Sequence, residues 1–232
     1  MGRPTGLILA LDTPDIAQAQ RWAETAGPHC GMLKLGLEFF LAHGAAGARA
    51  VASGRPIFLD LKLHDIPNTV AGAVRAVLEL YPRMVTLHAA GGGRMIAAAR
   101  QATEVAGALR PLLLGVTVLT SLDAAALHDT GVAGGVRQQV LRLARLALSA
   151  GADGVVCSPL EVAMLRDALG DAPVLVVPGI RPTGAAAGDQ ARTLTPREAA
   201  VAGADWLVVG RPITQAIDPA AAAVAVLAEI AG

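Results

Sequence analysis

The sequence has little charge and very few aromatic residues. Only 16% of its 232 residues are charged, the net charge is zero, and three Phe, two Trp and one Tyr make up the aromatics. A zero net charge gives no sign of the basic surface that binds nucleic acids, and so few rings offer no stacking platform for single strands. We therefore expect no nucleic acid partner.

Long apolar runs and cysteines are scarce as well. No uninterrupted apolar run reaches the roughly 18 residues of a membrane span, and the N-terminal stretch lacks the apolar region of a secretory signal. These features predict a cytoplasmic protein with no membrane partner. Cys30 and Cys157 are far apart and show no metal-ligand spacing, so we interpret them as two buried, reduced thiols.

Apolar residues make up 53% of the chain and form eight short runs. Most runs are continuous in Val, Ile and Leu, as expected of parallel strands that are covered on both faces. The predicted strands are 6–12, 31–37, 56–62, 84–89, 112–120, 154–158, 174–180 and 206–211. Ala-rich segments with helical spacing lie between them, including 15–26, 69–80 and 136–150. We expect Pro14 and Pro159 in first helical turns.

Eight strands that alternate with helices predict a (β/α)₈ TIM barrel, formed as a single domain over residues 1–232. The alternative is an open, doubly wound sheet. Its dinucleotide fingerprint needs a Gly-rich turn after the first strand, where this chain has LALDTPD. The Gly91–Gly93 run after the fourth strand does not match that motif, and a tight turn is the simpler interpretation.

Each predicted strand ends in residues capable of chemistry or of close ligand approach. In a barrel those ends share one rim, which carries the active site in this fold. The residues are Asp12, Lys34, Asp60 and Lys62, His88, Thr120, Ser158, Pro178 with Gly179, and Gly210 with Arg211. Five charged groups in a chain with little charge favour a functional site over chance polar caps.

The third predicted strand runs into the stretch FLDLKLHDIPNTV, residues 58–70. Asp60 and Lys62 are two residues apart, so on a strand their side chains point to the same face. Lys34, at a neighbouring strand end, can reach the same region, where opposite charges offset one another's desolvation. A solvated salt-bridge cluster is the alternative, but buried ion pairs contribute little stability. The set that includes Asp65 therefore favours function.

The stretch DLKLHDIPNTV resembles the D-x-K-x-x-D-I-P-N-T motif of the orotidine 5'-phosphate decarboxylase family. The resemblance continues through LALD (9–12), KLG (34–36), VTVLTS (116–121), VPGIRP (177–182), GDQAR (188–192), TP (195–196) and VVGRPIT (208–214). It implies a lyase of pyrimidine biosynthesis that converts orotidine 5'-monophosphate to UMP and CO₂. The resemblance also implies a homodimer that uses no cofactor and no metal.

The resemblance further implies a role for each matching residue. Lys62 would deliver a proton to C6 of the pyrimidine, and Asp60 would lie against the substrate carboxylate. Asp65 and Thr69 would reach across a two-fold interface into the partner's site. The remaining substrate-binding candidates are Asp12 and Lys34 for the ribose hydroxyls, Thr120 or Ser121 for the pyrimidine, Arg181, Gln190, Gly210 and Arg211 for the phosphate, and Pro178 in the VPGIRP segment.

Two other functions are alternatives. The first is a Mg²⁺-dependent sugar-phosphate decarboxylase or aldolase of the same superfamily; those enzymes lack the I-P-N-T continuation seen here at 66–69. The second is a non-catalytic barrel that binds phosphorylated ligands, although a binder has no need for a carboxylate beside that of the substrate. We interpret His88 as a hydrogen-bonded structural imidazole and His64 as a residue that orients the loop.

Overall fold

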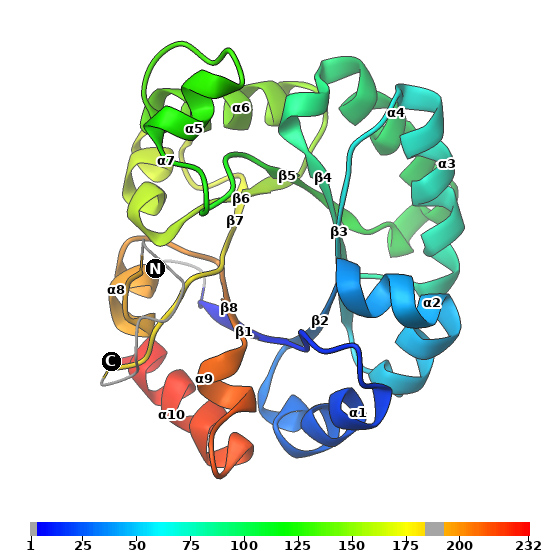
Figure 1. Ribbon diagram of the computed structural model, residues 1–232, viewed down its shortest axis with the longest axis vertical. Helices are drawn as coiled ribbons and strands as arrows, with labels where there is room; N and C mark the ends of the chain where they lie inside the picture. Colours follow the sequence, from blue (N-terminus) through cyan, green and yellow to red (C-terminus); the bar gives the residue numbers. More distant parts are fainter. Residues whose placement is uncertain (1–3, 184–192) are drawn as a thin grey trace.

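The structure, a computed structural model, describes residues 4–183 and 193–232 and forms a ring of parallel strands surrounded by helices (Figure 1). Each strand pairs in parallel with the next, and β8 pairs with β1, so the barrel closes. The predicted (β/α)₈ TIM barrel is therefore confirmed. Its strands are β1 Gly6–Ala10, β2 Met32–Gly36, β3 Ile57–Leu63, β4 Met84–His88, β5 Leu112–Val116, β6 Gly154–Val156, β7 Val174–Val177 and β8 Trp206–Val209.

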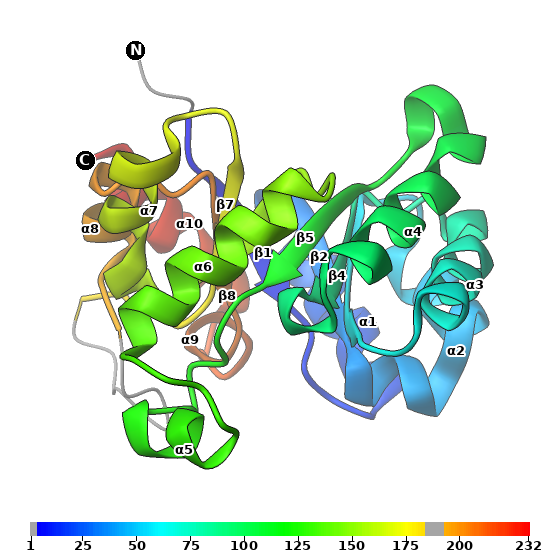
Figure 2. The ribbon, with the colours of Figure 1, turned by 90° about the horizontal axis from the view of Figure 1, so that it is seen from above.

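Ten α-helices and five short 3₁₀ helices are found in the described residues, and Figure 2 shows α5 projecting from the body of the barrel. The α-helices are α1 Ile16–Thr25, α2 Leu37–Ala52, α3 Pro67–Val77, α4 Gly93–Thr103, α5 Ala124–Asp129, α6 Val136–Ser149, α7 Val162–Leu169, α8 Pro196–Val201, α9 Arg211–Thr214 and α10 Pro219–Ala231. The 3₁₀ helices are η1 Gly27–His29, η2 Leu78–Leu80, η3 Ala89–Gly91, η4 Glu104–Leu109 and η5 Pro159–Glu161. None of the helices in these two ranges has the length and hydropathy needed to cross a bilayer.

Two predicted helix starts need correction. Pro14 does not lie in a first turn: the N-cap of α1 is Asp15, whose carboxylate accepts hydrogen bonds from the N–H groups of Ala17 and Gln18. That cap satisfies two free N–H groups, so the helix begins after Asp15. In contrast, α3 begins at Pro67, two residues earlier than predicted, because proline suits the first helical position.

Side chains alternate along the strands between two apolar layers. On β3, Leu59 and Leu61 pack in the layer between strands and helices, whereas Phe58 packs with Ile8, Met84 and other residues inside the barrel. Asp60 and Lys62 share the inward parity of Phe58. The inner layer fills the barrel below the rim, so the polar residues that continue it lie at the mouth.

Two aspartates, each paired with an arginine, link neighbouring strands at the opposite end of the barrel. Asp153 directly precedes β6; it binds both terminal nitrogens of Arg110, at 2.9 and 2.7 Å, and accepts the N–H of Leu113 at 2.8 Å. Asp205 precedes β8 in the same way, and it accepts from Arg166 Nη2 at 2.6 Å and from the N–H of Leu175 at 2.7 Å. The pairs lie in two similar segments, AGADG (150–154) and AGADW (202–206).

Candidate active site

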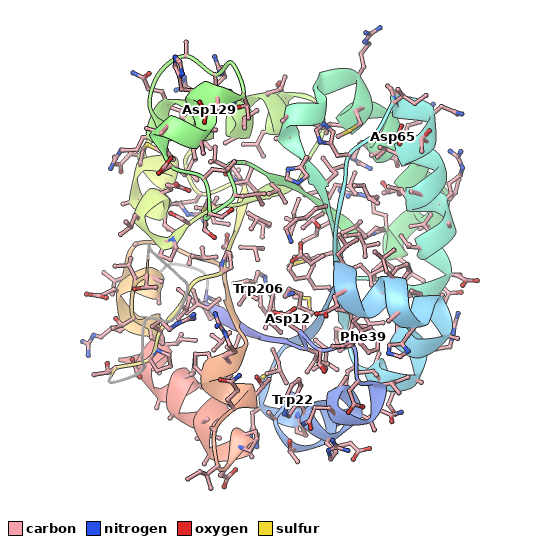
Figure 3. All side chains as sticks on the ribbon, in the orientation of Figure 1. Asp12, Trp22, Phe39, Asp65, Asp129 and Trp206 are labelled. Carbon is pink, nitrogen blue, oxygen red and sulfur yellow. The ribbon has the colours of Figure 1, made fainter. Side chains whose placement is uncertain are left out.

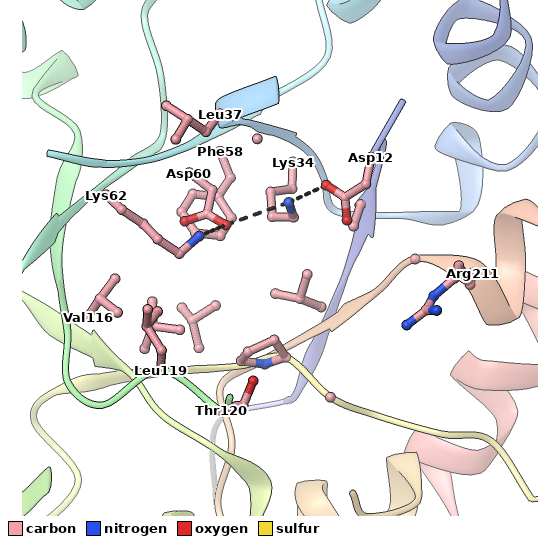
Figure 4. A pocket seen from close by; sticks show the side chains of 18 of the residues that line it. Asp12, Lys34, Leu37, Phe58, Asp60, Lys62, Val116, Leu119, Thr120 and Arg211 are labelled. Atoms are coloured by element: carbon pink, nitrogen blue, oxygen red, sulfur yellow. Dashed lines mark hydrogen bonds and ion pairs between the residues drawn. The ribbon is translucent and has the colours of Figure 1, made fainter. Parts of the chain in front are cut away.

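A cavity of about 490 Å³ opens at the carboxyl ends of the strands (Figure 4). Its size is within the range of about 300–1,000 Å³ that is usual for small-molecule sites. Most of the predicted site residues line it, namely Asp12, Lys34, Asp60, Lys62, Thr120, Pro178, Arg181, Gly210 and Arg211. The parallel strands therefore bring residues together that are up to about 200 positions apart in the sequence.

Four of these side chains form a continuous row of alternating charge, which we call the charged row: Lys62, Asp60, Lys34 and Asp12 (Figure 4). Lys62 Nζ lies 2.8 Å from Asp60 Oδ2, and Lys34 Nζ lies 3.6 Å from the same oxygen. On its other side Lys34 Nζ donates to Asp12 Oδ1 at 2.7 Å. Each inner member of the row therefore has an opposite charge on both sides.

The middle of the charged row is the most buried part. The side chains of Lys34 and Asp60 are 9% and 14% exposed, against 33% for Lys62 and 60% for Asp12. Burial alone would lower the pKa of Lys34, but Asp12 and Asp60 outweigh it and raise the pKa. Burial alone would raise the pKa of Asp60, but the two lysines and the hydrogen bonds from Lys62 and Thr86 lower it. Both groups are therefore ionised at neutral pH.

The backbone at Lys62 departs from strand geometry. Lys62 has φ of +49°, in the left-handed region that residues other than glycine rarely adopt. Its N–H donates to Thr86 Oγ1 at 2.9 Å, and the same hydroxyl donates to Asp60 Oδ1 at 3.0 Å. Thr86 was not predicted as a site residue, although a hydroxyl inside the apolar strand MVTLH was an available signal.

Two glycines allow close approach at the Asp12 end of the charged row. A Cβ at Gly36 would lie 3.2 Å from both Asp12 Oδ1 and Lys34 Nζ, so a side chain there would crowd the ion pair. A Cβ at Gly210 would lie 3.4 Å from Ala10 Cβ and 3.8 Å from Asp12 Oδ2. Gly210 and the Arg211 that follows it therefore adjoin the Asp12 end of the row. Gly36 was not predicted as a site residue.

Four predicted site residues lie elsewhere. Ser121 lines a second cavity of about 470 Å³, which Thr120 also lines. Asp65 and Thr69 are exposed on the loop after β3 and on the first turn of α3, and neither lines the main cavity of this chain. Figure 3 shows Asp65 beside α3, away from the barrel centre. Gln190 lies outside the described residues.

His64 and His88 pack against one another near the charged row, with ring centroids 5.4 Å apart. Burial lowers the pKa of His88, and His64 and Lys62 lower it further, so the imidazole is neutral at neutral pH. Neither ring lines the main cavity. The role of a hydrogen-bonded structural imidazole stays a prediction for His88.

The two cysteines are free thiols in different surroundings. Cys157 is buried and lines the main cavity, but Cys30 is partly exposed, so the prediction of two buried thiols is right only for Cys157. Burial raises the pKa of both thiols, that of Cys30 to about 12. Both are therefore protonated at neutral pH, when thiols are poor nucleophiles. Across residues 4–183 and 193–232, His, Cys, Asp and Glu form no group of three that could hold a metal ion.

Comparison with known proteins identifies the family. Residues 5–226 match the model of the orotidine 5'-phosphate decarboxylase / HUMPS family. The chain belongs to this family. Two relatives named orotidine 5'-phosphate decarboxylase are 56% identical (Gluconobacter oxydans, 100% of this chain and 99% of the relative) and 58% identical (Anaeromyxobacter sp. strain K, 96% of each). The family expected from the DLKLHDIPNTV motif is confirmed.

Solved structures of the family have the same fold. The crystal structure of orotidine 5'-phosphate decarboxylase from Lactobacillus acidophilus gives a TM-score of 0.87 at 40% identity, covering 99% of this chain and 100% of that one. The enzyme of that name from Pyrococcus horikoshii gives 0.79 at 26% identity, covering 97% and 99%. The barrel therefore persists while much of the sequence changes.

Proposed function

We propose that this protein is a cytoplasmic, homodimeric orotidine 5'-monophosphate decarboxylase, folded as one domain, that forms UMP and CO₂ without a cofactor. The observation that carries the proposal is the charged row at the mouth of a nucleotide-sized cavity. Relatives that are 56% and 58% identical over nearly their full length bear the name of this activity.

The order of groups along the cavity matches the order of parts in the nucleotide. Lys62 and Asp60 lie at one end of the charged row, and Asp12 lies at the other, beside Gly210. In orotidine 5'-monophosphate the ribose separates the base from the phosphate. The base would therefore lie at Lys62, the ribose hydroxyls at Lys34 and Asp12, and the phosphate at Gly210 and Arg211.

The charge of the cavity also suits this substrate. Its described lining carries four cationic side chains and only two anionic ones, while the substrate brings a phosphate and a carboxylate. Arg181 and Arg211 would bind the phosphate, since guanidinium groups can pair two of its oxygens at once. Gln190 would add an amide donor. Thr120 or Ser121, together with Pro178, would contact the pyrimidine side of the substrate.

Lys62 can supply the chemistry. When the bond between C6 and the carboxylate breaks, CO₂ leaves and the electron pair stays on C6, in the plane of the ring, where the π-system cannot delocalise it. The ammonium group of Lys62 would stabilise this charge as it develops and then transfer a proton to C6. One proton replaces one CO₂, so no oxidant or reductant is required.

Asp60 would act on the substrate carboxylate. Its lowered pKa keeps it ionised, and the two lysines beside it hold it in place. A bound substrate would bring a second carboxylate next to this one, and their repulsion disappears as CO₂ leaves. Asp60 would therefore favour the transition state over the bound substrate.

A dimer would explain the position of Asp65 and Thr69. Both are exposed on one short segment that also holds Ile66, which is 67% exposed. We propose that this segment completes the partner's site. Mixing inactive Lys62→Ala and Asp65→Ala subunits should restore activity, because one heterodimer site is then intact. No recovery, despite demonstrated subunit exchange, would contradict a shared site.

The activity is tested by following the loss of orotidine 5'-monophosphate absorbance with purified protein in EDTA. Turnover under these conditions is the expected result, since no step requires a metal. Activity on a sugar phosphate that appears only with Mg²⁺ would support the related metal-dependent enzymes. Nucleotide binding without turnover would support a binding protein.

A further inference from the structure

The hydroxyl of Thr86 lies beneath the charged row and contacts two of its members. Thr86 is fully buried on β4. Its Oγ1 accepts the N–H of Lys62 at 2.9 Å and donates to Asp60 Oδ1 at 3.0 Å. One hydroxyl therefore links the main chain of Lys62 to the carboxylate of Asp60, using both its donor and its acceptor capacity.

The pairing of β3 with β4 shows why this hydroxyl matters. Leu59 pairs with Val85, but the next pair joins Leu63 to Leu87. Four steps along β3 thus correspond to two steps along β4, so β3 bulges away from the regular ladder. Thr86 is the one residue of β4 between those two pairs. Its side chain receives an N–H from the bulge.

The bulge includes the strained residue of the site. Lys62 has φ of +49°, and a long side chain adopts this region only when its surroundings hold it there. The strain changes the direction in which the Lys62 side chain leaves the backbone. The hydrogen bond to Thr86 is a contact that ties this backbone in place.

Because of the second contact of Thr86, the two oxygens of the Asp60 carboxylate have different partners. Thr86 binds Oδ1, which leaves Oδ2 for Lys62 at 2.8 Å and Lys34 at 3.6 Å. Rotation of the carboxylate would break the contact with Thr86. The plane of the Asp60 carboxylate is therefore set from β4, behind the cavity wall.

We propose that Thr86 is a positioning residue for the decarboxylation: it holds the bulge that aims Lys62 at C6 and fixes the orientation of Asp60. This inference rests on the proposed function. Thr86 does not itself line the cavity, so it acts through Lys62 and Asp60. A small displacement of a reacting group costs about a hundredfold in rate.

The test compares Thr86→Val, which replaces the hydroxyl by a methyl group, with Thr86→Ser, which keeps it. We expect kcat of Thr86→Val to fall about ten- to a hundredfold. The KM should stay within about threefold, because Thr86 does not line the cavity in which the substrate would bind. Thr86→Ser should recover most of kcat. If Thr86→Val does not fold, Thr86→Cys, a weaker hydrogen-bonding group, takes its place in the comparison.

Thr103→Val is the matched control. Thr103 on α4 is also fully buried, and its hydroxyl donates to the carbonyl of Arg100 at 2.7 Å and accepts from Arg100 Nη1 at 3.2 Å. Loss of the Thr103 hydroxyl should lower the melting temperature of the protein and leave kcat unchanged. A purely structural role for Thr86 would give the same result as this control.

A crystal structure of the Thr86→Val protein is a readout that needs no activity. We expect Lys62 to leave the positive-φ region or its contact with Asp60 to lengthen. Unchanged geometry, kcat within twofold of the wild type, or a Ser variant as impaired as the Val variant would each overturn the inference. If the wild type itself does not turn over the nucleotide, the proposed function fails, and the crystal structure still decides whether Thr86 positions Lys62.

Discussion

Both ends of this barrel carry ion pairs, but the two sets of pairs differ in their surroundings. At the end where the strands begin, Asp153 and Asp205 each bind an arginine and a backbone N–H of a neighbouring strand. At the end where the strands finish, the members of the charged row bind one another and face a cavity. Aspartates pair with arginines and are enclosed by protein at one end, whereas at the other end they pair with lysines and face a cavity.

We interpret this difference as a structural use of charge at the first end and the proposed catalytic use at the second. A buried carboxylate is expensive unless its hydrogen bonds are satisfied, and Asp205 meets that condition with Arg166 and Leu175 N. Lys62 is one-third exposed and has a strained backbone. Backbone strain and charged groups that face a cavity are typical of catalytic sites.

The largest expected effect is on kcat and concerns the charged row. Lys62→Ala removes the proposed proton donor, so kcat should fall at least about a thousandfold. UMP affinity should change by less than about tenfold, because most of the contacts proposed for the nucleotide remain. Steady-state kinetics measure kcat, and calorimetry measures the affinity for UMP. Near-normal turnover would contradict the role of Lys62.

At the end of the barrel that holds the Arg166–Asp205 pair, a substitution should lower stability and leave kcat unchanged. Arg166→Met removes one member of a buried ion pair, the guanidinium that Asp205 binds at 2.6 Å, which should lower the free energy of unfolding by about 3–5 kcal/mol. The kcat of the folded protein should not change. Urea unfolding and kinetics on the same sample test both. Arg49→Met is the control: its partner Glu79 is 3.7 Å away, both side chains are mostly exposed, and such a pair contributes less than about 1 kcal/mol.

The smallest effect concerns His88, a group near the charged row that does not face the cavity. Because its pKa is lowered in the folded protein, the unfolded chain binds a proton first as the pH falls. Keeping His88 neutral therefore contributes to the free energy of unfolding in full above the pKa of an unfolded histidine, about 6.5. This contribution is lost as the pH falls from there through the lower pKa of the folded state. Urea unfolding at pH 8 and pH 5 should therefore show a smaller pH effect in His88→Asn than in the wild type. The exposed His128→Asn is the control, and an equal pH effect in both variants would contradict the prediction.

Much of the fold and part of the candidate site could be predicted from local patterns. Each of the eight apolar runs overlaps one strand, and the rule that parallel strands end on one rim correctly placed Asp12, Lys34, Asp60 and Lys62 together. Helix starts were less accurate, since a cap such as Asp15 competes with a nearby proline. The AGAD segments were visible in the sequence, but nothing local indicated that their aspartates would each bind an arginine.

Local patterns in the chain were enough to predict the barrel from its apolar runs and the family from the DLKLHDIPNTV motif. They also predicted Lys34, Asp60 and Lys62 as one charged set, but with Asp65 as its fourth member, whereas in the structure Asp12 takes that place. The way in which β3 pairs with β4 could not be predicted from these local patterns. A bulge there changes the register without changing the apolar pattern, so no sequence period reveals it. The strained Lys62, the hydroxyl of Thr86 beneath it and the room that Gly36 leaves for the ion pair all depend on contacts between strands, and these form only when the barrel closes.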